Sequence, residues 1–155
     1  MTDKPIPAQY TLFKGKSAMR LQMQKPEADF KTGCIFMQIA PFKEERNGTK
    51  IYSWEDLKIS VKLGINDLTT LVYAFDSAGE CSLFHKFNDT SKTIALKVND
   101  TRGWFLAVNE IKKDGAKSMV SIPVSREEGY IISVMIKAAF PALHGWEIGR
   151  ASCRE

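Results

Sequence analysis

The sequence predicts an α+β fold of antiparallel sheets with two helices. Alternating apolar and polar residues, which are typical of strands, fill most of residues 10–61 and again residues 81–124. Helical spacing appears in two segments, and each one follows a group of strands instead of alternating with single strands. A chain of 155 residues is long enough for one domain with a sizeable core, so we expect a single domain over residues 9–146.

The first group begins with residues 10–24, which alternate as one long strand that Pro26 ends. Its apolar face carries Phe13, Met19, Leu21 and Met23, and its polar face carries Lys14, Lys16, Arg20, Gln22 and Gln24. Residues 33–40 are apolar on both faces, which favours a central strand ending at Pro41. Residues 43–50 follow as a polar loop with the turn at Asn47-Gly48.

Residues 50–61 are predicted as a third strand, with Tyr52, Trp54 and Lys58 on its polar face. Helical spacing then takes over in residues 64–75, where Asn66 is a suitable N-cap.

Four short strands and a helix complete the chain. The strands are residues 81–87, 93–98, 104–108 and 119–124, separated by turn residues. Ser125 and Glu128 have capping-box spacing at the start of a helix that reaches about residue 140. Pro141 should kink or end this helix.

The two ends of the chain differ from the rest. Residues 1–8 are expected to be a flexible N-terminus and contain no targeting pattern, which favours a cytoplasmic or viral-replication-associated protein. Residues 147–155, EIGRASCRE, do not continue the helical periodicity. One back-translation of them resembles the start of a sequencing adaptor, so we expect this tail to be non-native.

Several kinds of chemistry are excluded. Gly15-Lys16-Ser17 matches the end of a phosphate-binding loop, but Tyr10 stands where the first glycine is needed. The three cysteines and two histidines lack zinc-site spacing, and no catalytic motif is present. We therefore expect no enzyme activity, no metal and no cofactor. The net charge of +4 permits an anionic partner without requiring one.

Basic and aromatic residues share the polar faces of several predicted strands. Single-strand binders need this combination, because cations neutralise phosphates and flat rings stack unpaired bases. Each sign alone has a simpler explanation, since strand lysines also protect sheet edges and single aromatic rings usually belong to the core. The candidate nucleic-acid-binding residues are Lys14, Lys16, Arg20, Tyr52, Trp54, Lys58, Phe84, Lys86 and Phe105.

The chain contains five short motifs in order, which are FKGKSAM, Tyr52-Ser53-Trp54, Leu83-Phe84-His85, Ile122-Pro123-Val124 and residues 141–146. Together they resemble the Whirly family of plant single-stranded-DNA-binding proteins. FKGKSAM is similar to that family's KGKAAL-type signature, and Tyr52-Ser53-Trp54 to its YDW. Leu83-Phe84-His85 resembles its FFHDP element, although Lys86-Phe87 replaces the Asp-Pro. Ile122-Pro123-Val124 resembles its (V/I)PVT, and residues 141–146 its P-x-(L/M)-x-G-W. The resemblance covers residues 9–146.

The resemblance implies two four-stranded antiparallel sheets packed crosswise, with two helices that assemble a homotetramer. It also implies that single strands bind with little sequence preference, their bases stacked between the sheets of neighbouring subunits. The segment between Pro26 and Gly33 is shorter than the family's hairpin, so the second strand is expected to be stunted or missing. Lys14 and Lys16 are expected to meet either nucleic acid or a neighbouring subunit.

The leading interpretation is a sequence-tolerant single-stranded-DNA-binding protein, with no membrane or small-molecule partner, that serves replication, repair or recombination. Two alternatives remain open at this point. One is an RNA-binding protein or RNA chaperone of the same fold, which a contact to the 2′-hydroxyl would favour. The other is an oligomeric scaffold that binds no nucleic acid.

Overall fold

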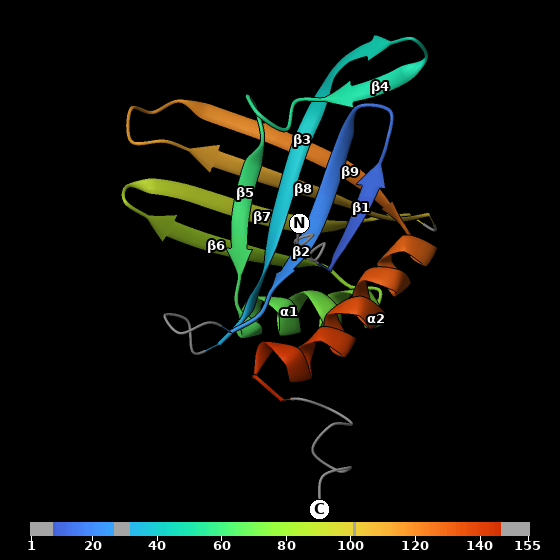
Figure 1. The fold of residues 1–155 in the computed structure, drawn as a ribbon, viewed down its shortest axis with the longest axis vertical. Helices are drawn as coiled ribbons and strands as arrows, with labels where there is room; N and C mark the ends of the chain where they lie inside the picture. Colours follow the sequence, from blue (N-terminus) through green and yellow to red (C-terminus); the bar gives the residue numbers. More distant parts are fainter. Residues whose placement is uncertain (1–7, 27–31, 101, 147–155) are drawn as a thin grey trace, which may run out of the picture.

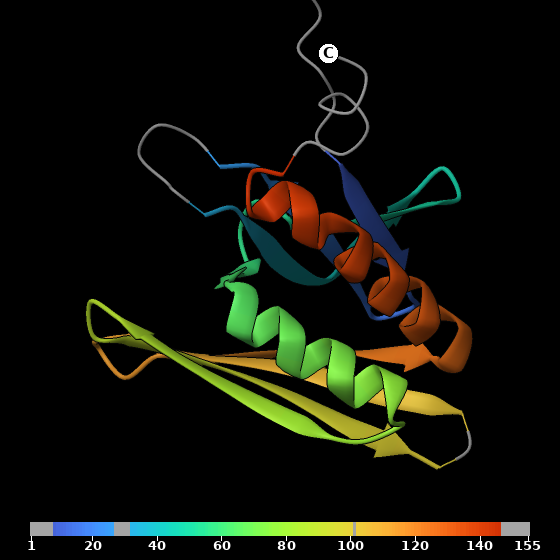
Figure 2. The same cartoon turned by 90° about the horizontal axis from the view of Figure 1, so that it is seen from below.

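Two antiparallel sheets lie face to face with their strands crossing, and two helices close one end of the space between them (Figures 1 and 2). This computed structural model describes residues 8–26, 32–100 and 102–146. The expectations for the N-terminal segment and for the tail after Trp146 therefore concern residues outside the described ones, apart from Ala8.

The first sheet contains five strands: β1 (Gln9–Phe13), β2 (Ser17–Gln24), β3 (Cys34–Arg46), β4 (Thr49–Tyr52) and β5 (Ile59–Leu63). The predicted central strand is confirmed, because β3 pairs with β2 along one edge and with β5 and β4 along the other. Met37 thus lies opposite Leu21 on one side and Val61 on the other. β3, the strand that follows the short segment after Pro26, has 13 residues and is paired on both edges, so the expectation of a stunted or missing second strand is wrong.

The predicted long strand over residues 10–24 is wrong, because the chain reverses at Lys14–Lys16 to form a hairpin. The Lys14 N–H donates to the Ser17 carbonyl oxygen over 2.8 Å, and Leu12 lies opposite Met19. Side chains alternate on a strand, so a turn at this position places Phe13 opposite Ala18 on the outer face of the sheet. Phe13 therefore does not share the core face of Met19, as the sequence had suggested.

Two further boundaries differ from the sequence prediction. β3 continues through Pro41, and the predicted loop is a hairpin whose Asn47-Gly48 turn has positive φ angles of 50° and 79°. Proline has no N–H to donate, but the Pro41 carbonyl accepts a hydrogen bond from the Ser53 N–H, so the chain remains paired at this position. The predicted strand over residues 50–61 is interrupted after Tyr52 by a turn at residues 54–57, and Lys58 follows that turn.

The second sheet is the predicted four-stranded meander, with each strand paired to the next. Its strands are β6 (Cys81–Phe87), β7 (Thr90–Asn99), β8 (Gly103–Ile111) and β9 (Lys117–Ser125). β7, β8 and β9 are longer than predicted because the turn residues between them are few. The register aligns Leu83, Ile94, Val108 and Val120 in a row across the inner face. This row faces the first sheet across the core.

The helices are α1 (Ile65–Asp76) and α2 (Arg126–Leu143). The N-cap of α1 is Gly64 instead of the predicted Asn66, and the Asp67 carboxylate accepts the Gly64 N–H over 3.1 Å. The capping box of Ser125 and Glu128 is confirmed at the start of α2. Pro141 does not end α2, which continues to Leu143, because the proline lies in the last turn and removes only one helical hydrogen bond there.

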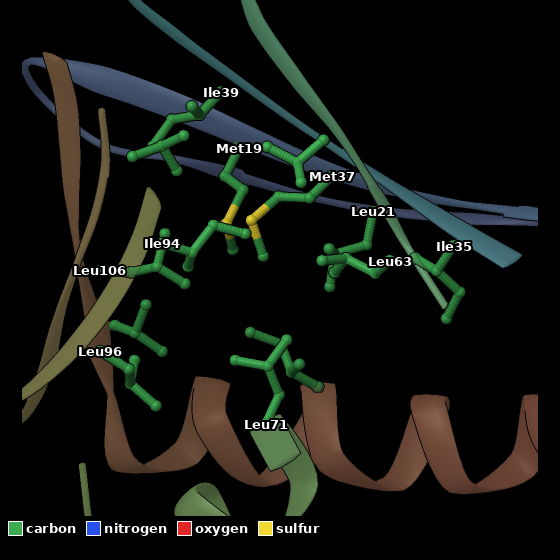
Figure 3. Packing of buried hydrophobic residues seen from close by; sticks show 14 of the residues in the cluster. Met19, Leu21, Ile35, Met37, Ile39, Leu63, Leu71, Ile94, Leu96 and Leu106 are labelled. Carbon is green, nitrogen blue, oxygen red and sulfur yellow. The ribbon is translucent and has the colours of Figure 1, made fainter. Parts of the chain in front are cut away.

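One apolar core fills the space between the sheets and the helices (Figure 3). The thioethers of Met19 and Met37 point from the first sheet toward Ile94 and Leu106 of the second. All four side chains are almost fully buried. The inward faces of both sheets are therefore buried in the core and are not accessible to a ligand.

We predict that Gly129→Ala destabilises the protein, although alanine is the better helix former. A Cβ at this position would lie 2.5 Å from Trp104 Cζ3 and 3.0 Å from Phe75 Cδ1, where α2 packs on two buried rings. We expect a loss of about 1–3 kcal/mol in the free energy of unfolding, measured with urea. In a Trp104→Phe background the same substitution should cost less, and an equal cost would show that the ring contact is not the cause.

Candidate nucleic-acid interface

The predicted binding residues divide between two faces that point away from each other. Arg20 and the aromatic residues Tyr52 and Trp54 lie on the outer side of the first sheet, while Phe84 and Phe105 lie on the outer side of the second. The core lies between the sheets (Figures 1 and 2). The structure therefore does not bring the predicted residues together on one face of the chain.

The outer face of the second sheet carries two exposed rings on either side of a row of small side chains. Phe84 is 66% exposed and Phe105 is 45% exposed. The row between them consists of Ser82, Ala95, Ala107 and Ser121. Lys97 lies beside Phe105, and Lys86 lies two residues after Phe84 on the same face. This face is a flat platform with an aromatic ring and a cation on each side.

The outer face of the first sheet is built around two buried alanines. Ala18 and Ala40 are neighbours in the register and have no exposed surface, because Tyr52 and Trp54 cover them. The Tyr52 ring packs against Phe13, with 5.7 Å between ring centroids, and is only 8% exposed. Its hydroxyl donates to the Lys14 carbonyl oxygen. The Tyr52 ring is therefore used inside the subunit.

Phe13 and Phe42 are the exposed rings of this face, at 64% and 38%. They were not among the predicted site residues. The sequence signal for them is the alternation of side chains counted from a turn at Lys14–Lys16, which places Phe13 outward. Lys97 and Lys50 were also missed, although both are exposed lysines on strands.

Arg20 presents a flat surface on the same face. Its guanidinium lies over the Trp54 ring, 4.3 Å from the ring centroid, and Nη1 donates to Gln38 Oε1 over 3.4 Å. A guanidinium held flat on an indole is a stacking partner as well as a charge. Lys58 is exposed in the connection between β4 and β5, directly before β5.

Lys14 forms an ion pair within the chain. Its Nζ lies 2.6 Å from Glu128 Oε1, in the first turn of α2. The same Glu128 carboxylate accepts the Ser125 N–H over 2.9 Å and so closes the capping box. Lys16 is exposed and forms no ion pair with any residue that the structure describes. Of the two lysines, Lys16 therefore has its charge available to a partner.

Residues 12–135 match the model of a family described as Whirly transcription factor. The chain belongs to the Whirly family. This match supports nucleic-acid binding and covers every predicted site residue, from Lys14 to Phe105. The comparison with curated proteins finds no match.

Solved Whirly structures have the same fold. The crystal structures of WHY1 and WHY3 from Arabidopsis thaliana superpose with TM-scores of 0.82, at 21% and 20% sequence identity. These alignments cover 99% and 98% of this chain and all of each Arabidopsis chain. The plant transcriptional regulator PBF-2 superposes with a TM-score of 0.78 at 21% identity, over 98% of this chain and 90% of that one.

Three of the five Whirly-like motifs lie where an element ends, while Leu83-Phe84-His85 lies within β6 and Ile122-Pro123-Val124 within β9. FKGKSAM forms the β1–β2 hairpin turn, and Tyr52-Ser53-Trp54 begins the turn after β4. His85 of the LFH element connects β6 with α1, because its Nε2 lies 3.0 Å from Oδ2 of Asp67. At the end of α2, the Trp146 N–H donates to the Pro141 carbonyl. In this Whirly chain the motifs therefore fix turns and contacts between elements.

Part of each helix surface is apolar and uncovered in the single subunit. Tyr73 on α1 is 76% exposed and Tyr130 on α2 is 71% exposed. Ile131, Val134 and Met135 extend this surface along α2.

No described helix is long and apolar enough to cross a membrane, and residues 8–26, 32–100 and 102–146 contain no cluster of three possible metal ligands.

The contact between Lys14 and Glu128 predicts acid sensitivity. Burial alone would raise the pKa of Glu128, but the bonds from Lys14 and Ser125 outweigh it and hold the pKa below the usual value of 4.5. A carboxyl whose pKa is lower in the folded state stabilises the fold above its usual pKa, and this contribution disappears as the pH falls through the folded value. Stability should therefore decrease below about pH 4.5.

Glu128→Gln removes this ionisation and should flatten the pH dependence of the free energy of unfolding between about pH 2.5 and 6, measured with urea. Glu127→Gln is the matched control, because Glu127 is the exposed neighbouring acid in the same helical turn. A pH dependence in Glu128→Gln as steep as in the unmodified chain would contradict the assignment.

Proposed function

We propose that this chain binds single-stranded DNA with little sequence preference, as a homotetramer, and serves replication, repair or recombination. The observation that carries the proposal is the platform on the second sheet. Phe84 and Phe105 stand exposed beside Lys86 and Lys97, on a face that the core does not use. Exposed rings beside cations suit unpaired bases, which stack at about 1–3 kcal/mol each.

Low sequence preference follows from the chemistry of this face. Every base has a π-face, so stacking on Phe84 and Phe105 does not distinguish one base from another. The row between the rings carries methyl and hydroxyl groups, with no long side chain that could reach along a base edge. The lysines contact phosphates, which are the same at every nucleotide.

The arrangement of the two faces supports assembly of several subunits, and the number four is what the resemblance to the Whirly family implies. A single strand that contacts both faces must pass between two subunits, because the faces of one subunit point apart. The apolar residues on both helices provide surface for such an assembly, since patches of this kind mark interfaces between proteins. A neighbour that covers Tyr73, Tyr130 and Val134 would remove them from water.

We predict that Phe84→Ala and Phe105→Ala each weaken binding of a short oligothymidine by about fivefold to one hundredfold, the loss of one stacked base. Binding should also fall steeply with salt, because phosphate contacts release counterions. Trp146→Ala is the control, since Trp146 is 72% exposed but lies off both sheets. The affinity and its salt dependence can be measured by fluorescence titration with oligothymidine at several salt concentrations.

Three outcomes would contradict the proposal: no binding at about 50 mM salt, a preference for duplex DNA, or an equal loss in Trp146→Ala. Competition between matched DNA and RNA strands decides the sugar. A preference for RNA would replace DNA by RNA as the ligand, because it would indicate a contact to the 2′-hydroxyl.

We predict that Ile131→Glu combined with Val134→Glu gives a monomer in sedimentation analysis, because two carboxylates would have to be buried in the helix interface. Binding of oligothymidine should weaken in parallel, since the opposed faces then lose their partner subunit. Arg126→Glu is the control for added negative charge on α2, at an exposed position near its start. A tetramer that persists in the double variant would exclude this surface from the assembly.

A further inference from the structure

The β1–β2 turn and β4 line a shallow hollow apart from the platform on the second sheet. Its volume is about 600 Å³, and its lining residues are Phe13, Lys14, Gly15, Thr49, Lys50 and Tyr52. The hollow lies at the rim of the first sheet, on the outer side that carries Arg20 and Trp54. It combines an exposed ring, a free lysine and a glycine backbone.

The ring in this hollow is held in place before any ligand arrives. Phe13 is 64% exposed and rests against Tyr52, whose hydroxyl is bound to the Lys14 carbonyl. Lys14 is in turn fixed to Glu128 on α2. A ring supported through these contacts loses little freedom on binding, so most of the stacking energy remains available to the complex.

The cation in the hollow is Lys50. A Cβ added to Gly15 would lie 4.0 Å from Lys50 Nζ, so the ammonium group lies over the glycine of the turn. Lys14 is neutralised by Glu128, whereas Lys50 is exposed and forms no ion pair with a residue in the described part of the chain. Lys50 is therefore the lining lysine whose charge can serve a ligand.

We propose that this hollow is a subsite for one nucleotide of a bound single strand, with the base on Phe13 and a phosphate on Lys50. This inference rests on the proposed function. Phe13 pairs with Ala18, which lies two residues, or about 7 Å, along β2 from Arg20. A strand stacked on Arg20 and Trp54 thus reaches Phe13 in a short step. The subsite extends the binding track to the edge of the sheet.

The test compares Lys50→Gln and Phe13→Ala with the matched control Lys43→Gln. Lys43 is an exposed lysine on the same β3–β4 hairpin, but it lies 3.7 Å from Asp56 and outside the hollow. Oligothymidines of increasing length are titrated at several salt concentrations, and each variant is sized by sedimentation with and without the oligonucleotide.

Both Lys50→Gln and Phe13→Ala should weaken binding of the longer oligonucleotides and leave the shortest ones unaffected, because a single nucleotide at the rim is lost. Lys50→Gln should also lower the slope of log affinity against log salt by about 0.7, the value for one phosphate of a single strand. Phe13→Ala should leave that slope unchanged, since its ring carries no charge. Lys43→Gln should resemble the unmodified chain.

The subsite is overturned if Lys50→Gln binds all lengths normally, or if Lys43→Gln produces the same loss, which would indicate a general effect of charge. A change in oligomeric state without a change in salt slope would also overturn it and assign the hollow to contacts between subunits. Failure of the unmodified chain to bind any oligonucleotide would instead refute the proposed function, and the subsite with it.

Discussion

The structure depends on one constraint, which is that two crossed sheets share a single core. Met19 and Met37 from the first sheet and Ile94 and Leu106 from the second are buried in the same core (Figure 3). The inward faces of both sheets are therefore covered. The outward faces must then point in opposite directions. Exposed aromatic rings therefore lie on both sides of the molecule, with Phe13 and Phe42 on the first sheet and Phe84 and Phe105 on the second.

The β1–β2 turn links the core to the outer surface and to the helices. Its short reversal sends Leu12 inward and Phe13 outward, and its Lys14 joins the capping box of α2 through Glu128. Tyr52 completes the junction by donating to the turn backbone. A lysine that could serve a phosphate is thus committed to positioning a helix, while Lys16 and Lys50 remain exposed beside it.

The sequence predicted the second half of the chain better than the first, for a local reason. The turns after β6 and β7 carry Asn and Asp, and Ser125 and Glu128 mark the start of α2, so each boundary has its own signal. The reversal at Lys14–Lys16 has one glycine between two lysines, and apolar alternation continues on both sides of it. This pattern therefore predicts one continuous strand, and it places Phe13 on the core face instead of the outer face where it lies. Pro41 suggested that β3 ends there. The strand nevertheless continues, because β3 stays paired with β2 at Pro41 and with β4 beyond it.

Alternation and capping are encoded by residues close together in the chain, so local patterns were enough to predict the fold class, the two helices and the meander of the second sheet. They also predicted the outward position of Phe84 and Phe105. Tertiary structure decided which candidates are free to bind. Lys14 meets a carboxylate 114 residues away, and Tyr52 is covered by Phe13 and Phe42 from other strands. Such contacts depend on how distant elements pack, and local spacing along the chain carries no record of them.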